Sequence, residues 1–449
     1  MNDNIFREYD IRGLVDREIS DADVVILGRA MGTYLSGKGA RTIALGRDVR
    51  LSSDRYRELL LEGLLSTGLT VYDVGVCPTP LLYYAVFRLD TQGGVMITAS
   101  HNPPPYNGFK ILAGKTTIHG AEIQEVARVA REGNFTRGTG RLETRDVISD
   151  YLDYVAANIK IERPLKVAVD CGNATGGPVA LPLMERLGIE VAPLYCEPDG
   201  NFPNHEPDPT VLENIKDLSA LVRREGLEAG VAYDGDCDRV GVVDETGRAI
   251  YGDMLLTIFA RSILPENPGA TFIAEVKCSK NLYDDINRRG GNALMWKTGH
   301  SLIKAKMLET GALLAGEMSG HMFFKHRWFG FDDGIYASLR LLELLSQSDK
   351  PLSTWLSDLP PVVSTPEIRV DCPDAIKFQV VEEVGKILRD QEVIGVDGVR
   401  VNFPDGWGLV RASNTQPALV LRFEAKSEER LAEIRDLVEG AVAQAQAAL

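Results

Sequence analysis

The sequence is poor in cysteine, in long apolar runs and in basic side chains relative to acidic ones. Its six cysteines form no CxxC pair, so a zinc site or a disulfide framework is not expected, and a reducing cytoplasm is the expected compartment. No stretch approaches the roughly 18 apolar residues of a membrane helix, and the N-terminal MNDNIFREYDIRG has no apolar run typical of a signal peptide. Since 49 Lys and Arg face 64 Asp and Glu, the net charge is −15, and neither nucleic acid nor a membrane is expected as a partner.

Nucleotide-binding signatures are absent too. The chain contains no GxxxxGK[ST], which excludes an ATP-binding P-loop, and the glycine-rich stretch CGNATGG at 171–177 is not a GxGxxG fingerprint. A phosphorylated ligand would therefore have to be attracted by a local basic pocket in an otherwise acidic chain.

What the sequence does contain is an alternation of short apolar runs with amphipathic stretches, the pattern of an α/β protein. Three times, a strand, a loop and a helix lead to a strand that ends in a polar loop containing glycine. The strands expected in these three units are Arg41–Leu45, Val71–Val74, Gly94–Ile97, Lys166–Val169, Gly230–Tyr233, Phe272–Val276 and Ala312–Ala315. The repeat predicts three similar α/β units whose loops lie at equivalent sheet ends, where such folds usually place their chemistry.

The last part of the chain differs. It follows a Pro-rich joint, Pro360–Pro366, and contains expected strands at Glu367–Val370, Gly398–Phe403, Gly408–Ala412 and Ala418–Ala425, with helices at Ala375–Arg389 and from Glu428. This order indicates a small α+β domain. The predicted domains are residues 1–147, 148–249, 250–361 and 362–449.

The first polar loop is TASHNPPPYNGFK, from Thr98 to Lys110. Its three consecutive prolines make it stiff, which suits a residue that must be held in place, such as Ser100 as a nucleophile or phosphate carrier. An ordinary Ser/Asn/Pro turn is the alternative. A hydrolase triad is disfavoured, because there is no GxSxG around Ser100, and His101 would point the other way in an extended chain.

The second loop, DGDCDR, places Asp234, Asp236 and Asp238 at a spacing of two. A curved loop can bring all three carboxylates onto one cation, and hard oxygen ligands suit Mg²⁺ or Mn²⁺ better than zinc. An EF-hand is rejected, because Arg239 stands where that loop needs glycine and both flanks are strand-like. The Arg239 guanidinium is suited to phosphate oxygens.

Two further loops are weaker signals by themselves. In GEMSGH (316–321), Glu317 and Ser319 alternate onto one face, which suits the reading of paired hydroxyls, although a tight turn is the simpler explanation for this segment alone. RASNTQP (411–417) combines a guanidinium with hydroxyls and an amide, which can bind an anion, or it is a polar hairpin loop. The residues concerned are Arg411, Ser413, Asn414 and Thr415.

Four other side chains are candidates on position alone. Tyr9 and Arg12 lie in the N-terminal segment FREYDIRG, whose basic residues hint at an anion site. Lys277 and His300 each follow a strand-like run. A surface charge or a structural histidine is the commoner explanation for such residues.

These four loops, in this order, resemble the α-D-phosphohexomutase superfamily over essentially the whole chain. The resemblance implies four domains in a heart shape around a central cleft. It implies that Ser100 carries a phosphoryl group and that, with it, Asp234, Asp236 and Asp238 hold Mg²⁺. That family usually has glycine where Cys237 stands.

The resemblance also implies the remaining site residues. RASNTQP would bind the phosphate that is not reacting, GEMSGH would read the sugar, and its methionine is typical of the phosphomannomutase/phosphoglucomutase branch. The side chains placed in the cleft are Tyr9, Arg12, Lys110, Arg239, Lys277, His300 and His321. His321 and His300 are the first choices for the general base, and Lys110 is expected to orient phosphate.

The implied reaction is the interconversion of hexose 1-phosphate and hexose 6-phosphate, of mannose or glucose, through a hexose 1,6-bisphosphate that turns around in the cleft. A phosphoglucosamine mutase, a metal-dependent sugar phosphatase and a silent sugar-phosphate binding protein are the alternatives. A cytoplasmic monomer that acts on small sugar phosphates is expected.

Overall fold

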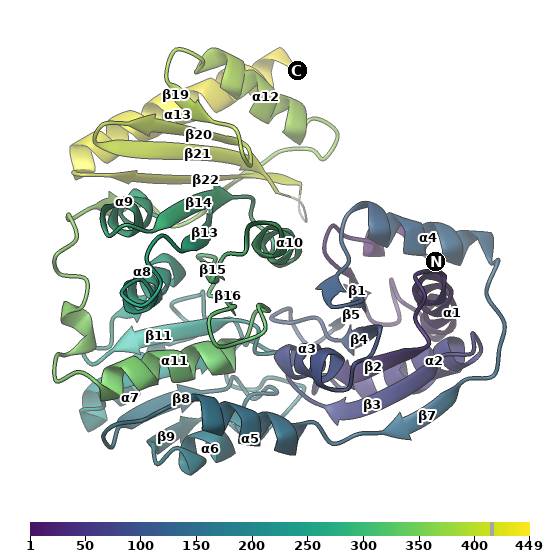
Figure 1. The fold of residues 1–449 in the computed structure, drawn as a ribbon. Coiled ribbons are helices and arrows are strands. Elements are labelled where there is room, and N and C mark those ends of the chain that lie inside the picture. The colour runs from purple at the N-terminus through teal and green to yellow at the C-terminus, as the bar shows by residue number, and fades with distance from the viewer. Residues whose placement is uncertain (414–416) are drawn as a thin grey trace.

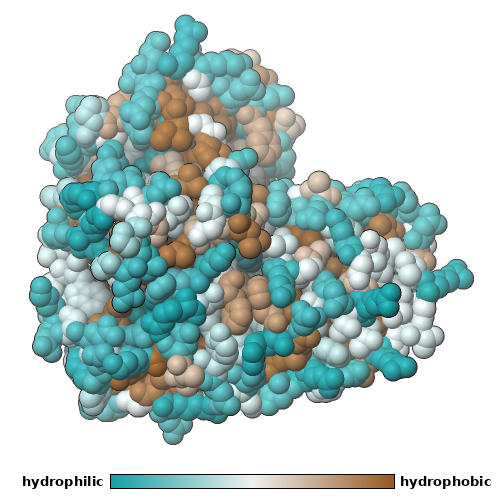
Figure 2. All heavy atoms as spheres, in the orientation of Figure 1, coloured by the Kyte–Doolittle hydropathy of each residue, from teal (hydrophilic) through white to brown (hydrophobic). Residues whose placement is uncertain are grey.

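The computed structural model describes residues 1–413 and 417–449. Four β-sheets follow one another along the chain, and the domains around them surround a common centre (Figure 1). The first and fourth domains form two lobes, and the space-filling view shows a largely hydrophilic surface that is indented between them (Figure 2). Among the described residues, no helix is long and apolar enough to cross a membrane.

The first sheet has seven strands in the order β1-β5-β4-β2-β3-β7, with β6 beside β5. The strands are β1 (Ile11–Leu14), β2 (Thr42–Arg47), β3 (Thr70–Val76), β4 (Gly93–Ile97), β5 (Tyr106–Ala113), β6 (Thr116–Thr117) and β7 (Arg141–Thr144). Its helices are α1 (Asp21–Gly37), α2 (Ser53–Leu65), α3 (Thr79–Arg88) and α4 (Ala121–Glu132). Buried residues of α1, α2 and α4 share one apolar core with the sheet, whereas α3 joins a larger core that continues into the next two domains.

The second and third domains repeat this plan with smaller sheets, ordered β12-β11-β10-β8-β9 and β14-β13-β15-β16. Their strands are β8 (Lys166–Asp170), β9 (Glu190–Leu194), β10 (Ala229–Tyr233), β11 (Val240–Asp244), β12 (Ala249–Ile250), β13 (Thr271–Glu275), β14 (Asn292–Trp296), β15 (Leu314–Gly316) and β16 (Met322–Phe324). Their helices are α5 (Ile148–Asn158), α6 (Gly177–Arg186), α7 (Lys216–Glu225), α8 (Gly252–Ile263), α9 (Lys280–Arg288), α10 (His300–Thr310) and α11 (Gly334–Ser346).

The predicted equivalence of the three polar loops is confirmed by the strand pairing. The strands β4, β10 and β15 each pair in parallel on one side and turn back into an antiparallel neighbour on the other. TASHNP, DGDCDR and GEMSGH are the connections at these three turns. Each loop therefore leaves the carboxyl end of a buried strand, and the three domains deliver their loops to the same centre (Figure 1).

The fourth domain is the predicted small α+β unit. Its six strands are all antiparallel: β17 (Val363–Ser364), β18 (Ile368–Asp371), β19 (Glu392–Ile394), β20 (Val399–Phe403), β21 (Gly406–Ala412) and β22 (Ala418–Ala425). Helices α12 (Lys377–Ile387) and α13 (Glu428–Ala448) pack on one face. Trp407 and Leu409 pack against Val276 of the third domain. The predicted boundaries at 147, 249 and 361 fall near the transitions between sheets, and the cut points themselves stay a prediction.

The crossing of α1 and α2 depends on glycine. A Cβ added to Gly63 would clash with the carbonyl oxygen of Val25 and would lie 2.7 Å from the Cα of Gly28. Both are backbone atoms, so neither can move away by a side-chain rotation. By contrast, a Cβ at Gly440 of α13 would meet nothing within 4 Å. The close approach of α1 and α2 therefore needs small residues, and the α13 position does not.

We expect Gly63→Ala to lower the free energy of unfolding by about 1–3 kcal/mol, because the methyl group forces two backbones apart. Gly440→Ala is the matched control and should raise it by about 0.5–1 kcal/mol through helix propensity alone. Urea denaturation of both variants measures the two values. Equal effects would contradict the close packing of α1 against α2.

Candidate active site

Ser100 lies at the turn between β4 and β5 and is 2% exposed. Its Oγ donates to Oδ2 of Asp234 at 2.8 Å, and its backbone N–H donates to the Oγ1 of Thr98 at 2.8 Å. Its φ is +50°, a left-handed conformation that non-glycine residues adopt rarely. The strain is retained where the hydroxyl must face the second domain, which is typical of a functional position.

This turn overturns one expectation from the sequence. His101 was expected to point away from Ser100, as in an extended chain, but its Nδ1 lies 3.1 Å from the serine Oγ, because the positive φ of Ser100 folds the backbone back. Burial, helped by Arg239 and Arg12, holds the pKa of His101 well below its usual value. Since the serine gives its only proton to Asp234, the Nδ1 of a neutral His101 must be the donor to Oγ.

A buried arginine braces the loop from behind. The Arg50 side chain is fully buried and pairs with Asp48 at 3.1 Å. Its guanidinium donates to four carbonyl oxygens of the loop, those of Ser100 at 2.7 Å, Asn102 at 2.5 Å, Pro103 at 2.8 Å and Tyr106 at 3.1 Å. The Arg50 guanidinium therefore holds the backbone of this proline-containing loop in one conformation. Sequence reasoning missed this residue.

The three aspartates of DGDCDR converge as predicted. Asp234, Asp236 and Asp238 are buried, and one oxygen from each lies within 4.8 Å of the others. The loop joins β10 to β11, so the helical flanks of an EF-hand are absent here, as expected. Oδ1 of Asp236 is a buried carboxylate oxygen with no hydrogen-bond partner among the described residues. Three hard oxygen donors with an unsatisfied one among them fit a small divalent cation such as Mg²⁺.

Cys237 takes the position at which the family resemblance leads one to expect glycine. Its φ is +59°, which explains why glycine suits this position. The Sγ of Cys237 lies 3.5 Å from the Oγ1 of Thr175, and the side chain is part of the apolar core. Thr175 also donates to the carbonyl oxygen of Gly235 at 2.9 Å. The cysteine is therefore accommodated without disturbing the convergence of the aspartates.

Two neighbouring domains neutralise the acidic loop. Nζ of Lys110, on β5, lies 2.7 Å from Oδ2 of Asp236 and 2.5 Å from Oδ2 of Asp238. Burial would lower the pKa of this lysine, but the two carboxylates outweigh burial and raise it. The pKa of Asp234 is raised by burial and by the other two aspartates, whereas Lys110 and His321 hold that of Asp238 well below its usual value against the effect of burial.

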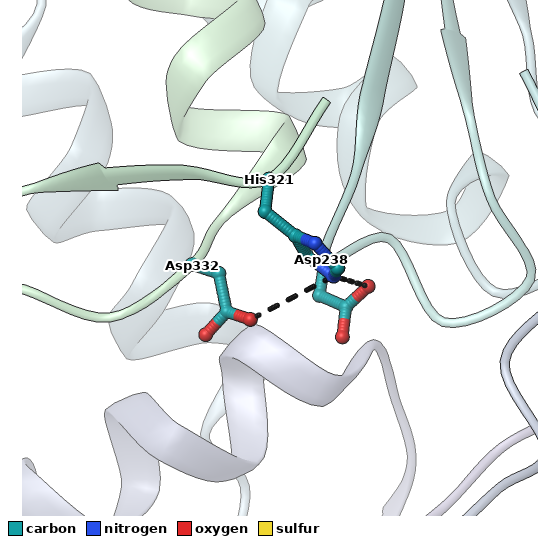
Figure 3. A group of neighbouring side chains, drawn as sticks. All are labelled: Asp238, His321 and Asp332. Carbon is teal, nitrogen blue, oxygen red and sulfur yellow. Dashed lines mark hydrogen bonds and ion pairs between the residues drawn. The ribbon is translucent and has the colours of Figure 1, made fainter. Parts of the chain in front are cut away.

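His321, from the third domain, is the other counter-charge. Its Nε2 lies 3.2 Å from Oδ1 of Asp238 and 3.9 Å from Oδ2 of Asp332 (Figure 3). Its Nδ1 lies 2.7 Å from Oε2 of Glu317. Burial lowers the pKa of this imidazole, but Asp238 and Glu317 outweigh burial and raise it to about 10. The ligand atoms of Asp238, His321 and Asp332 also all lie within 4.8 Å of one another, so Asp238 belongs to two clusters of possible metal ligands.

His300 has the opposite environment. Burial and the ammonium of Lys304 hold its pKa well below the usual value, so the ring is neutral. Nζ of Lys304 lies 3.2 Å from Nδ1 of His300 and 2.8 Å from Oδ1 of Asp332. A lysine can only donate, so Nδ1 accepts and the ring proton sits on Nε2. The His300 and His321 rings stack at 5.8 Å, one neutral and one charged.

The remaining predicted residues lie around this centre. Arg239 follows the acidic loop, with Nε 3.9 Å from Oδ2 of Asp234. Ser319 Oγ lies 3.1 Å from Nδ1 of His321, while Oε1 of Glu317 accepts from the Gly299 backbone N–H at 2.6 Å. Both Glu317 oxygens therefore contact protein groups.

Arg12, in the N-terminal segment, donates to Oδ1 of Asn102 at 2.5 Å and to the carboxylate of Asp10.

The predicted phosphate cradle lies in the fourth domain. Arg411 closes β21, and its Nε lies 2.9 Å from Oδ2 of Asp397. Nζ of Lys277 pairs with Oε2 of Glu367 at 2.7 Å, at the joint between the third and fourth domains. Ser413 is buried beside them, whereas the predicted residues Asn414 and Thr415 lie outside the described part of the chain.

Contacts link the first three domains directly. They run from Ser100 to Asp234, from Lys110 to Asp236 and Asp238, and from Asp238 to His321. Sequence reasoning missed a set of supporting residues, namely Arg50, His101, Lys304, Asp332 and Asp397. Of these, only Lys304 carried a usable signal, since it follows His300 by one helical turn.

We expect Arg50→Lys to lower the free energy of unfolding by about 2–4 kcal/mol, because an ammonium cannot satisfy the four carbonyl oxygens that the guanidinium reaches. Hydrogen exchange of peptides spanning residues 98–110 should quicken most. Arg55→Lys is the matched control, since that arginine is 42% exposed and pairs with Asp16 at 2.8 Å. Urea denaturation and exchange mass spectrometry give both readouts. Equal exchange in the two variants would contradict the bracing role.

Comparison with known proteins agrees with the four-domain architecture. The family models for phosphoglucomutase/phosphomannomutase match in chain order, with α/β/α domain I at 3–137, domain II at 149–247, domain III at 251–363 and the C-terminal domain at 367–441. A phosphomannomutase/phosphoglucomutase of Pseudomonas aeruginosa is 49% identical, over 96% of this chain and 94% of the relative. A phosphoglucomutase of Neisseria gonorrhoeae is 47% identical, over 96% and 95%. A crystal structure of a phosphoglucomutase/phosphomannomutase family protein from Burkholderia thailandensis superposes with a TM-score of 0.93 at 42% identity, covering 99% of this chain and 98% of that one. The chain therefore belongs to the phosphoglucomutase/phosphomannomutase family, in the bacterial branch of the α-D-phosphohexomutase superfamily.

Proposed function

We propose that this chain is a phosphohexomutase that interconverts the 1-phosphates and 6-phosphates of mannose and glucose, with Ser100 as the phosphoryl carrier and a hexose 1,6-bisphosphate as the intermediate. The observation that carries the proposal is the hydroxyl of Ser100, held 2.8 Å from Asp234 in a buried cluster built by three domains. The names of the close relatives support both sugars.

Charge balance supports a divalent cation together with a phosphoserine. Lys110, Arg239 and His321 lie against the three aspartates, so the chain itself supplies positive charge around the acidic loop. A dianionic phosphoryl group would add uncompensated negative charge there unless about two positive charges entered with it. We propose that Asp234, Asp236, Asp238 and the Ser100 oxygen would hold Mg²⁺, which, when bound, withdraws charge from the transferring phosphoryl group.

The residues around the serine have distinct tasks. Arg239 would bind phosphoryl oxygens with its guanidinium. His101, whose Nδ1 donates to Oγ, would stabilise negative charge on Oγ when the phosphoryl group leaves it. Lys110 would orient the phosphate as a cation, since its neighbours keep it charged.

The two histidines would have different roles in the reaction, and only one of them would exchange a proton with the substrate. His300, with its proton on Nε2, would donate a hydrogen bond to the ligand rather than act as a base. His321 would exchange a proton with the sugar hydroxyl at Nε2, because Glu317 and Asp238 stabilise its charged form. Pairs of groups whose pKa values are driven apart in this way are typical of acid–base sites.

The sugar itself would be read by GEMSGH, and the far phosphate by Arg411, Ser413, Asn414 and Thr415 with Lys277. Tyr9 and Arg12 would close the site from the first domain. A phosphoglucosamine mutase fits less well, since the relatives named above are enzymes of mannose and glucose phosphates. We also propose a cytoplasmic monomer with no nucleic acid or membrane partner.

We expect Ser100→Ala to lower mutase turnover at least about 1,000-fold, because it removes the group that carries the phosphoryl. Intact-mass and peptide mapping of the parent protein should find one phosphoryl group on Ser100 and none in the variant. Ser66→Ala, outside the site, should keep both properties. Steady release of free phosphate from glucose 1-phosphate would instead indicate a sugar phosphatase, and near-normal turnover of Ser100→Ala would refute the carrier.

We expect chelation by EDTA to abolish turnover and Mg²⁺ to restore it. Asp236→Asn removes one of three anionic ligands and should raise the Mg²⁺ concentration needed for half-maximal activity by roughly tenfold or more. Asp153→Asn is the control, since that carboxylate is 75% exposed and pairs only with Arg186 among the ion pairs described. An unchanged Mg²⁺ requirement in Asp236→Asn would rule out the proposed ligand set.

A further inference from the structure

Thr298 makes hydrogen bonds to residues of three domains. Its carbonyl oxygen accepts from the hydroxyl of Tyr9, in the first domain, at 2.9 Å. Its side-chain Oγ1 donates to Oε2 of Glu275, in its own domain, at 2.5 Å. Its backbone N–H donates to Oδ2 of Asp397, in the fourth domain, at 3.0 Å. The peptide stands two residues before His300, so it lies at the edge of the active site.

Asp397 makes a second contact with the same oxygen. Its Oδ2 also accepts from Nε of Arg411 at 2.9 Å. The side chain of Asp397 is 16% exposed and that of Arg411 is 8% exposed, so the pair is shielded from water and keeps much of its strength. One carboxylate oxygen thus joins the predicted phosphate-binding arginine to the loop of another domain.

The local backbone enforces this arrangement. Gly398 has a φ of +83°, and a Cβ there would lie 2.7 Å from the Cβ of Arg411, so the turn that carries Asp397 packs directly on the arginine. Because Asp397 contacts Nε, it sets the rotation of the guanidinium without using Nη1 and Nη2. Those two nitrogens are a pair of donors that can hold a phosphate bidentately.

We propose that Asp397 is a positioning residue for the phosphate cradle: it orients Arg411 and fastens the fourth domain to the Thr298 peptide, so that a hexose phosphate meets a preset guanidinium. This inference rests on the proposed role of Arg411 in binding the phosphate that is not reacting. Preset donors avoid the entropic cost of ordering a long side chain on binding, so their loss weakens ligand affinity.

Steady-state kinetics with both glucose 1-phosphate and glucose 6-phosphate test the proposal. Asp397→Ala should raise KM roughly 10-fold for both substrates and change kcat by less than about threefold, because the contact to the far phosphate is the same in the ground state and the transition state. Asp405→Asn is the matched control: its carboxylate pairs with Nε of Arg430 at 3.0 Å in the same domain, 40% exposed. It should leave KM and kcat unchanged. Equal kinetics of the two variants would overturn the proposal.

A double-mutant cycle separates positioning from a general structural role. If Asp397 acts through Arg411, the double variant Asp397→Ala/Arg411→Ala should have a KM within about twofold of that of Arg411→Ala alone. Losses that multiply would mean that Asp397 acts independently of the arginine, and would overturn the proposal. The thermal midpoint of Asp397→Ala, compared with that of Asp405→Asn, shows whether the fold is intact.

Calorimetric binding of glucose 6-phosphate to the Ser100→Ala protein needs no turnover. There, Asp397→Ala should weaken binding roughly 10-fold. Unchanged affinity would overturn the inference about Asp397. Absence of mutase activity in the parent protein, with the affinity loss still observed, would count against the proposed reaction and leave the positioning role standing.

Discussion

Three buried carboxylates in one loop are the constraint on which the rest of this structure depends. Asp234, Asp236 and Asp238 would repel one another strongly in a site with little water unless positive charge reached them from outside their own domain. Lys110 arrives from the first domain and His321 from the third. Charge neutralisation at one point therefore joins the first three domains in addition to the apolar core that they share, and that point is where the polar loops meet.

The repeated architecture explains how three polar loops reach one point. Each of the first three domains ends a parallel strand in a polar loop and turns back into an antiparallel neighbour. The same backbone plan thus presents the loops proposed to carry the phosphoryl group, hold the metal and read the sugar, and these loops differ in their side chains. The fourth domain, with its antiparallel sheet, carries Arg411 of the proposed phosphate cradle.

The sequence predicted the site best where several functional side chains lie close together in the chain. TASHNP and DGDCDR each place several functional side chains directly after an apolar strand, so both their location and their partners could be predicted. The same reasoning did not find Arg50, Asp332 or Asp397, because the residues that they contact lie far away in the sequence or have no regular spacing from them. Lys304 was also missed, although it lies one helical turn after His300.

Local conformation was the other limit. His101 was misplaced because its direction depends on the left-handed φ of Ser100, which no residue type in the loop announces. Strands such as β9 and β14 were not predicted, since they are only half-buried and mix polar with apolar residues. Gly63 shows the same limit at a helix crossing, where the requirement for a small residue comes from the partner helix.

Lys110 has a consequence for how the protein is put together. Its ammonium contacts Asp236 and Asp238 at the distances of strong ion pairs, and it comes from a different domain. The first two domains therefore share a resident counter-ion that the chain supplies itself, independently of any dissolved metal. A divalent cation at the proposed site would therefore have to compete with Lys110 for the oxygens of Asp236 and Asp238. The chain thus supplies the charge that lets the first two domains pack together, and under the proposed function the activation of the centre would depend on an ion that can exchange with solution.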